Sequence, residues 1–71
     1  MISVYAEAVQ RALGDDYIVT EFTGEDRNVR QLRVERHGRI KYTAQHSILA
    51  PDDPKLVASV VEAIRGNFKD M

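Results

Sequence analysis

Apolar and polar residues alternate on both sides of the dipeptide His37-Gly38, and this alternation constrains the fold more than any other feature of the chain. The apolar positions are the even-numbered ones in both runs: Leu32, Val34, Ile40, Tyr42 and Ala44. A period of two residues is typical of strands that bury one face. The pattern therefore predicts a β-hairpin with strands over 29–36 and 39–48.

The parity of this pattern also predicts the register of the hairpin. Directly paired residues share a face of the sheet. A two-residue turn at 37–38 would pair Val34 with Lys41 and bury the wrong set. We therefore expect a three-residue turn over 36–38, with Gly38 left-handed. The predicted cross-strand pairs are Val34 with Ile40, Leu32 with Tyr42, and Glu35 with Arg39.

A third strand-like run spans residues 17–23, and residues 24–28 read as a loop by composition. Tyr17 and Val19 lie on one face of this run, and Ile18 and Phe22 on the other. Because both sets are apolar, either face can meet the core.

Both ends of the chain carry helical patterns. At the first end, Ser3 is a candidate N-cap and Gly14 stands where a left-handed residue ends a helix. Apolar residues recur between them near helical spacing, at Ile2, Tyr5, Val9, Ala12 and Leu13.

At the second end, Asp53 and Pro54 suit the N-cap and first position of a helix that Gly66 ends. Its apolar stripe comprises Val57, Val60, Val61, Ile64 and Phe68. The fold class predicted is α+β: helix, strand, strand, strand, helix, in a single domain over 1–71. We expect a three-stranded antiparallel sheet with both helices packed on one face.

The chain has 71 residues, no Cys and a formal net charge of −1. A chain of this size buries a modest share of its surface, so a homodimer is one way to add stability. The absence of Cys fits a reducing, cytoplasmic setting. Residues 1–13 lack the basic start of a signal peptide, and no apolar run is long enough for a membrane span.

Charge is distributed unevenly. Residues 24–46 carry a net charge of +3 and the remainder −4. The predicted register places seven residues on the sheet face away from the helices: Gln31, Arg33, Glu35, Arg39, Lys41, Thr43 and Gln45. Such a face is commonly a water-covered surface. It is also a candidate for binding phosphate or an acidic protein, with Arg27, Arg33, Arg39 and Lys41 as the basic candidates.

Residue patterns of catalysis are absent from the sequence. His37 lies in the predicted turn, and His46 is expected as the partly buried polar end of the core face. With no carboxylate expected to converge on them, we predict no metal site and no cofactor. The paired acids at 15–16 and 52–53 read as turn and cap residues. No serine has a readable activating motif, so the protein is expected not to be an enzyme.

The order of elements resembles the double-stranded RNA-binding domain. Tyr17 and the run Thr23-Gly24-Glu25-Asp26-Arg27 stand where that family has its first strand and its minor-groove loop. That family places a Lys-rich cluster at the start of its last helix. Here that stretch is Asp52-Asp53-Pro54-Lys55, which would repel phosphate. The resemblance therefore implies the fold and not the RNA-binding activity.

A second resemblance, from about residue 2 to residue 68, is to small phage anti-CRISPR proteins that inhibit Cas9. The residues that carry it are Asp16-Tyr17-x-Val19, Gly24-x-Asp26-x-Asn28, Gln31-Leu32, Gly38, Tyr42 and Ala63-Ile64-Arg65-Gly66-Asn67-Phe68. This resemblance implies occupation of the DNA-binding surface of an effector nuclease, with acidic side chains in place of phosphates. The acidic candidates here are Asp15, Asp16, Glu21, Glu25, Asp26, Asp52 and Asp53. Ordinary turn and cap roles are the alternative for these acids.

Two functional hypotheses follow. In the first, the chain is a non-enzymatic interaction protein of phage or mobile-element type that binds and inhibits a host protein or nucleoprotein. In the second, it binds nucleic acid through the basic sheet face, with an affinity that falls steeply as salt rises. The sequence leaves open whether the acidic or the basic residues make the contact.

Overall fold

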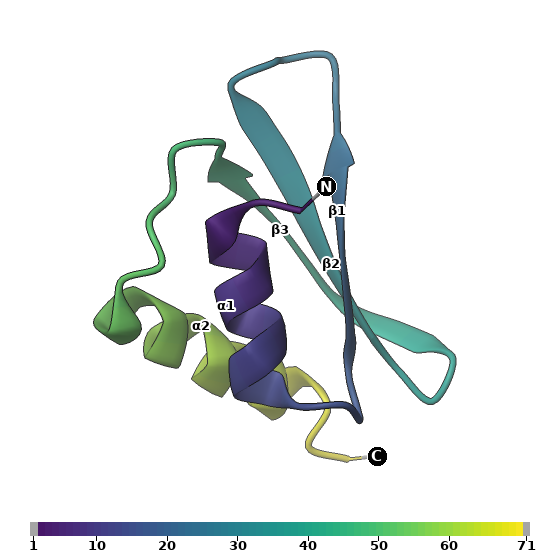
Figure 1. Ribbon diagram of the computed structural model, residues 1–71. Helices are drawn as coiled ribbons and strands as arrows, with labels where there is room; N and C mark the ends of the chain where they lie inside the picture. Colours follow the sequence, from purple (N-terminus) through teal and green to yellow (C-terminus); the bar gives the residue numbers. More distant parts are fainter. Residues whose placement is uncertain (1, 71) are drawn as a thin grey trace.

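The computed structural model describes residues 2–70, which form one layer of helices on one antiparallel sheet (Figure 1). The elements in chain order are α1 (Val4–Leu13), β1 (Ile18–Thr23), β2 (Val29–Arg36), β3 (Arg39–Ser47) and α2 (Pro54–Asn67). The strands are ordered β1-β2-β3, so β2 is central and β1 and β3 are edges. Both helices cover the same face of the sheet. The predicted α+β fold is confirmed.

The N-terminal helix α1 begins and ends where the sequence indicates. The Ser3 hydroxyl accepts a hydrogen bond from the backbone N–H of Ala6, and Gly14 follows the helix with a φ of 90°. The buried residues of α1 are Tyr5, Ala6, Val9 and Leu13. The buried stripe thus includes Ala6, whereas Ile2 and Ala12, which the spacing grouped with the core, are exposed.

The C-terminal helix α2 is capped by Asp53, whose carboxylate accepts hydrogen bonds from the N–H groups of Lys55 and Leu56. The helix continues through Gly66 to Asn67, so its predicted end is wrong by one residue. Gly66 does not adopt a positive φ there, and nothing local stops the helix at it. The predicted stripe is confirmed: Val57, Ile64 and Phe68 are buried, and Val60 and Val61 pack against them.

The turn of the second hairpin differs from the prediction. It has two residues, since Arg36 pairs with Arg39, and both His37 and Gly38 adopt positive φ, at 53° and 80°. Two residues at positive φ form the turn that best matches the twist of the flanking strands. A two-residue turn alone would place Lys41 opposite Val34 on the buried face. A bulge prevents this, because Lys41 is an extra, unpaired residue between the Glu35–Ile40 and Val34–Tyr42 pairs.

This bulge corrects the predicted pairs. Val34 lies opposite Tyr42 rather than Ile40, and Leu32 lies opposite Ala44 rather than Tyr42. Ile40 belongs with the outward-facing residues and is 49% exposed. The bulge preserves burial of the β2 apolar face while moving Ile40 out of the core.

The face of β1 that the sequence left open is settled by burial. Tyr17 and Val19 are buried under the helices, whereas Ile18 and Phe22 are exposed on the opposite side of the sheet. The Tyr17 ring meets the Phe68 ring edge-on, with 5.4 Å between the centroids. This contact joins the start of β1 to the end of α2, so the core spans both layers.

Candidate functional site

The face of the sheet that the helices leave uncovered is the main candidate interaction surface. We call it the open sheet face. The strand register assigns it eleven residues: Ile18, Thr20, Phe22, Val29, Gln31, Arg33, Glu35, Ile40, Thr43, Gln45 and Ser47. It is a continuous surface over three paired strands, so its side chains are held on a hydrogen-bonded scaffold.

A stacked pair lies on this face. The Arg33 guanidinium carbon is 4.4 Å from the centroid of the Phe22 ring, which is 42% exposed. A guanidinium over an aromatic ring is a favourable cation–π contact. Because each side chain holds the other, less rotamer freedom is lost when a partner contacts them. Aromatic and Arg side chains are also the residues most enriched at the energetic centres of protein interfaces.

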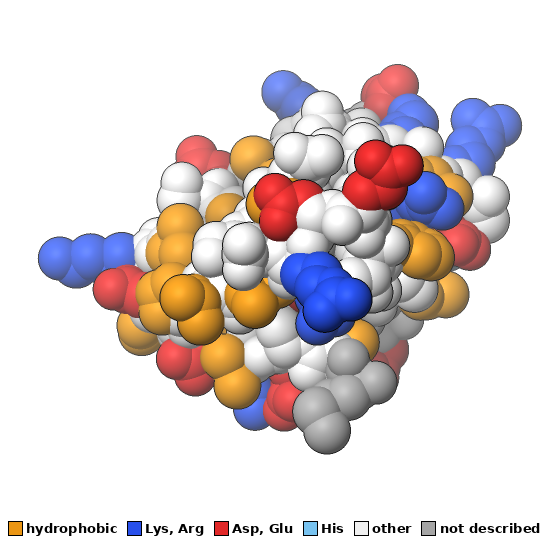
Figure 2. All heavy atoms as spheres, turned by 90° about the horizontal axis from the view of Figure 1, so that it is seen from above, with side chains coloured by type: hydrophobic (Ala, Val, Ile, Leu, Met, Phe, Trp, Pro, Cys, Tyr) orange, Lys and Arg blue, Asp and Glu red, His pale blue; other side chains and the backbone are white. Residues whose placement is uncertain are grey.

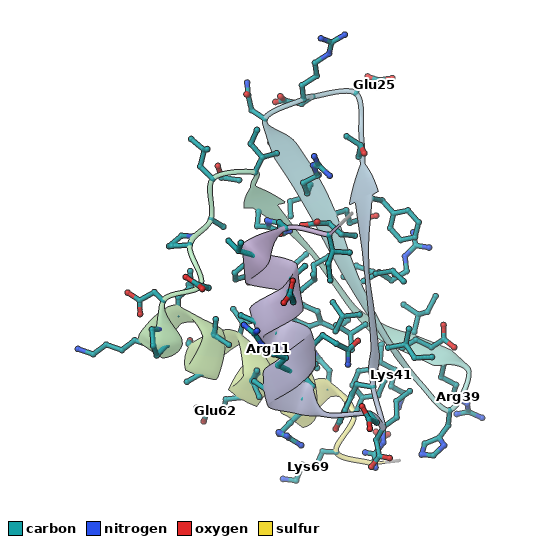
Figure 3. All side chains as sticks on the ribbon, in the orientation of Figure 1. Arg11, Glu25, Arg39, Lys41, Glu62 and Lys69 are labelled. Carbon is teal, nitrogen blue, oxygen red and sulfur yellow. The ribbon has the colours of Figure 1, made fainter. Side chains whose placement is uncertain are left out.

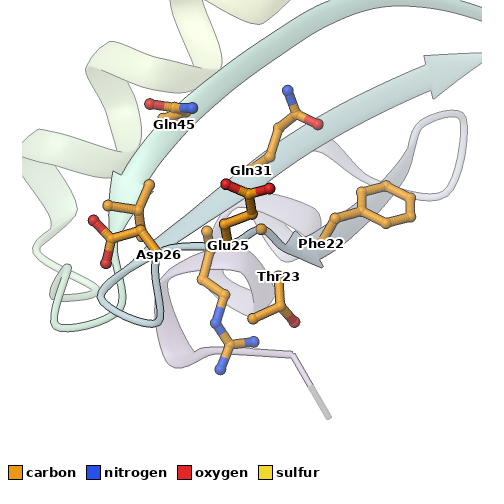
Figure 4. A pocket seen from close by; sticks show the side chains of 9 residues that line it. Phe22, Thr23, Glu25, Asp26, Gln31 and Gln45 are labelled. Carbon is orange, nitrogen blue, oxygen red and sulfur yellow. The ribbon is translucent and has the colours of Figure 1, made fainter.

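A pocket of about 410 Å³ adjoins the open sheet face at the β1–β2 loop (Figure 4). Its lining includes an aromatic ring, two amides, two acids and one base, at Phe22, Gln31, Gln45, Glu25, Asp26 and Arg30. The Asp26 carboxylate also accepts a hydrogen bond from the Asn28 N–H at 2.8 Å, which closes the loop. The pocket can therefore receive a side chain that carries hydrogen-bond donors and an apolar stem.

The four basic candidates do not share one face. Arg33 lies on the open sheet face, and Arg27 lies in the loop at one end of the molecule. Arg39 and Lys41 lie toward the opposite end of the molecule from Glu25, which marks the loop end (Figure 3).

The bulge is the physical reason for this separation. It directs Lys41 to the Asp70 carboxylate, with 2.9 Å between Nζ and Oδ1. Arg39 pairs with Arg36, whose guanidinium lies over the buried Tyr17 ring. The predicted placement of Arg39 and Lys41 on the face away from the helices is therefore wrong.

The seven acidic candidates also lie apart. The pairs 15–16, 25–26 and 52–53 occupy three separate corners, at the α1–β1 turn, the β1–β2 loop and the start of α2 (Figure 1). Asp53 is engaged as the cap of α2, and Asp16 lies 3.9 Å from Arg36. Figure 2, which looks onto the loop end, shows acidic and basic side chains interspersed and not a patch of one sign. No single acidic surface joins all seven residues.

Glu21 is removed from the exposed acids by its burial. Its side chain is 1% exposed and lies on the helix-covered face of β1. The carboxylate accepts hydrogen bonds from the N–H and the hydroxyl of Ser3, both at 2.8 Å. Its Oε2 also lies 2.9 Å from Nε2 of His46, whose ring stacks on Tyr5 with 4.7 Å between centroids. Glu21 therefore holds the start of α1 to β1 and β3.

This buried cluster of Ser3, Glu21 and His46 was missed by the sequence reasoning, which expected no carboxylate near either histidine. His46 itself lies on the core face as expected, with its side chain 9% exposed. The one available signal was that Glu21 shares the alternating face of Tyr17 and Val19, and that face could not be chosen from the sequence.

The order of groups in the cluster bears on its chemistry. In nucleophilic catalysis a histidine lies between the serine and the acid, so that it can take the hydroxyl proton. Here the carboxylate lies between Ser3 and His46, and the Ser3 hydroxyl also caps α1. Nε2 of His46 lies 2.9 Å from Glu21 Oε2 but makes no hydrogen bond. This arrangement serves to position α1 and offers no activated nucleophile.

Two titratable groups elsewhere have shifted pKa values. Burial raises the pKa of the Tyr5 phenol, and the neighbouring Tyr42 adds to that rise. The hydrogen bond from Lys41 lowers the pKa of the Asp70 carboxyl, with smaller contributions from other nearby groups. Both shifts report structural contacts, and neither group lies on the open sheet face.

Over residues 2–70, no cluster of three or more His, Cys, Asp or Glu side chains is arranged to hold a metal ion. No helix within the same residues is long and apolar enough to cross a membrane. Comparison of the chain with models of protein families, with curated proteins and with solved structures finds no match.

Proposed function

We propose that this protein is a non-enzymatic binding protein that inhibits a host protein or nucleoprotein in the cytoplasm of a bacterial cell. The phage anti-CRISPR proteins that it resembles imply the class of target, an effector nuclease. The contact is made by the open sheet face together with the pocket at its loop end. The observation that carries this proposal is the exposed Phe22–Arg33 stack on a paired sheet.

The composition of this surface favours a protein partner. Ile18 and Ile40 are exposed at one end of the face, Phe22 lies near the other, and polar side chains separate them. Apolar and aromatic anchors among polar groups are typical of protein–protein interfaces. The pocket lining has two acids, Glu25 and Asp26, against one base, Arg30, which favours a lysine or arginine of the partner. Such basic residues are abundant on nucleic-acid-binding surfaces.

The alternative, direct binding of nucleic acid, has less support. Of the four basic candidates, only Arg33 lies on the open sheet face, and its guanidinium is stacked on Phe22. Lys41 is already paired with Asp70. Affinity for nucleic acid comes largely from the counterions released when several Lys and Arg side chains contact neighbouring phosphates, and these basic side chains are too far apart to do so together. If this alternative holds, binding to nucleic acid alone will be measurable and will fall steeply as salt rises.

The test is inhibition of DNA cleavage by purified CRISPR effector nucleases, with wild-type protein and two matched variants. Phe22→Ser removes the exposed ring from the open sheet face. Val4→Ser removes an apolar side chain that is 62% exposed on α1, away from that face. We expect Phe22→Ser to weaken inhibition by at least about tenfold, the loss typical of an interface anchor, and Val4→Ser to inhibit as the wild type does.

The same assay with a gel shift on free DNA separates the two functions. Inhibition without binding to free DNA supports the proposal. Binding to DNA alone, lost when Arg33 is replaced by Glu, would support the alternative. Equal inhibition by both serine variants would exclude the open sheet face as the contact.

A further inference from the structure

The two edge strands of the sheet differ in how their outward-facing backbone groups are covered. On β1, the Gln10 side chain of α1 accepts a hydrogen bond from the Val19 N–H and donates one to the Tyr17 carbonyl, both at 2.8 Å. The carboxamide thus occupies the position that a neighbouring strand would take. Glu21 adds a buried charge to the same strand. Side-chain caps and inward-pointing charges are devices that keep an edge strand from pairing.

The edge of β3 has no such cover along its second half. Backbone groups of successive residues point to opposite edges of a strand. The Ile48 N–H donates a backbone hydrogen bond to the Asn28 carbonyl, so by alternation along the ladder the backbone groups of His46, Ala44 and Tyr42 also point toward β2. The N–H and C=O groups of Thr43 and Gln45 therefore point outward. Within residues 2–70, no hydrogen bond to these outward groups of Thr43 and Gln45 is formed. Both residues are exposed, so this edge is open to a further strand.

The open edge of β3 has no Asp, Glu, Lys or Arg side chain that would repel the same strand of a second copy. The segment Tyr42–Ser47 contains no Asp, Glu, Lys or Arg. The bulge and the charged residues of β3 lie at its other end, where Lys41 is turned to Asp70. Like charges placed opposite each other would oppose self-pairing, and here they are absent.

We propose that a second copy of this chain pairs with the first through β3, antiparallel and about a two-fold axis close to Ala44. Thr43 and Gln45 of each copy then supply about four backbone hydrogen bonds between the two β3 strands, a contact that we call the β3 seam. This pairing is self-complementary, as a two-fold interface requires. The open sheet faces of the two copies become one continuous surface. The proposal does not depend on the function of that surface.

Charge at the two ends of the seam favours this orientation. In an antiparallel pair, the start of one β3, with the basic Arg39, lies toward the segment that follows β3 in the other copy. That segment leads to the acidic Asp52 and Asp53 at the start of α2. A parallel pair would instead bring the two Arg39 side chains together. With the axis at Ala44, Arg39 of one copy lies opposite position 49 of the other, three residues before Asp52, so charge favours the antiparallel arrangement over the parallel one.

The test is the mass of the protein in solution as a function of concentration. Because the seam is short, the dimer is expected to be weak, and sedimentation equilibrium from about 10 µM to about 1 mM covers the relevant range. The wild-type mass is expected to rise from 8.1 kDa toward twice that value. A mass that stays at 8.1 kDa over the whole range would overturn the proposal.

Variants separate the β3 seam from other modes of association. Thr43→Lys combined with Gln45→Lys places like charges in the seam and is expected to weaken dimerisation by at least about tenfold. Thr43→Pro removes one outward N–H without adding charge, and the ladder to β2 does not use that group. Ser59→Lys, at an exposed position of α2, is the control and should dimerise as the wild type does. Wild-type dimerisation by the double-lysine variant would contradict the proposal.

Hydrogen exchange at single amides gives a second readout that does not depend on a substitution. The amides of Thr43 and Gln45 should exchange more slowly as concentration rises, whereas the Ala44 amide, bonded to β2, should be protected throughout. The Thr23 amide on the β1 edge should not change. Slowing at Thr23 in place of Thr43 would assign the seam to β1 and overturn the proposal.

Discussion

The Glu21 carboxylate lies 2.9 Å from Nε2 of His46, and both side chains are almost fully buried between the sheet and α1. Ser3 completes the group by donating two hydrogen bonds to the same carboxylate. Three elements that are distant in sequence therefore meet at one acidic side chain. A buried charge is tolerated only where such partners compensate for the loss of water.

Replacing Glu21 should be the most damaging single change to an acidic residue of this protein. Glu21→Ala removes the acceptor of both Ser3 hydrogen bonds and leaves the His46 ring beside an empty site. We expect a loss of about 3 kcal/mol in the free energy of unfolding, the range for breaking a buried pair. Urea denaturation followed by circular dichroism measures it. Glu7→Ala is the control, because the Glu7–Arg11 pair is exposed and contributes at most about 0.5 kcal/mol.

A double-mutant cycle with His46→Ala isolates the contact itself. If Glu21 and His46 stabilise each other, the double variant should lose about 1 kcal/mol less than the sum of the two single variants. Additive losses would show that Ser3 alone accounts for the role of Glu21.

Stability should decline at alkaline pH through Tyr5. Its pKa is raised in the folded state, so above the unfolded value of about 10 the unfolded chain releases the phenolic proton more readily than the folded one. The contribution of Tyr5 to the stability of the folded protein is therefore complete below the unfolded pKa, and it is lost as pH rises through the pKa of Tyr5 in the folded protein. Tyr5→Phe should reduce the difference in urea midpoint between pH 8 and about 10.5. An unchanged difference in that variant would assign the alkaline loss to other groups.

The two turn residues of the β2–β3 hairpin should respond in opposite directions. Gly38 has a φ of 80°, so Gly38→Ala should cost about 1 kcal/mol even though the space around it is open. His37 has a φ of 53°, which asparagine adopts more readily, so His37→Asn should add about 0.5 kcal/mol. Thermal unfolding of both variants measures the shifts. Destabilisation by His37→Asn would contradict the two-residue turn.

The bulge at Lys41 can be tested through Asp70. The hydrogen bond from Lys41 lowers the pKa of the Asp70 carboxyl, which favours the ionised form in the folded state. The stabilisation of the folded state by the Asp70 carboxylate is present above the pKa of Asp70 in the unfolded chain, and it is lost as pH falls through the pKa in the folded protein. In an NMR titration, Lys41→Met should bring the Asp70 pKa back up toward its ordinary value of 3.8. If Lys41 instead faced the open side of the sheet, the substitution would leave that pKa unchanged.

Most of the fold was predictable because its signals are local. Ser3, Gly14 and Asp53 mark helix ends through hydrogen bonds and dihedral angles within a few residues, and the strand limits follow from alternation. The register was not predictable. The register depends on a two-residue turn in which His37 adopts a positive φ, which is uncommon for residues other than glycine. It also depends on the bulge at Lys41, which restores burial of the apolar residues of β3 after that turn.

The candidate site was less predictable, because it depends on which faces meet. Ile18 and Phe22 are as apolar as Tyr17 and Val19, so composition could not decide which pair is buried. That choice places Phe22 on the open sheet face and buries Glu21. The separation of Arg39 and Lys41 from Arg33 likewise follows from one extra residue in β3.

The most direct test of the proposed function is a map of the bound surface by NMR. Amide and methyl resonances of the labelled protein are followed while a purified effector nuclease is added to equal concentration. We predict that changes concentrate at Ile18, Phe22, Arg33 and Ile40, and that the exposed Val4 of α1 and Leu49 of the β3–α2 loop are unaffected. Changes confined to Val4, Leu49 and the helices, or no change with any effector, would contradict the assignment of the open sheet face as the binding surface.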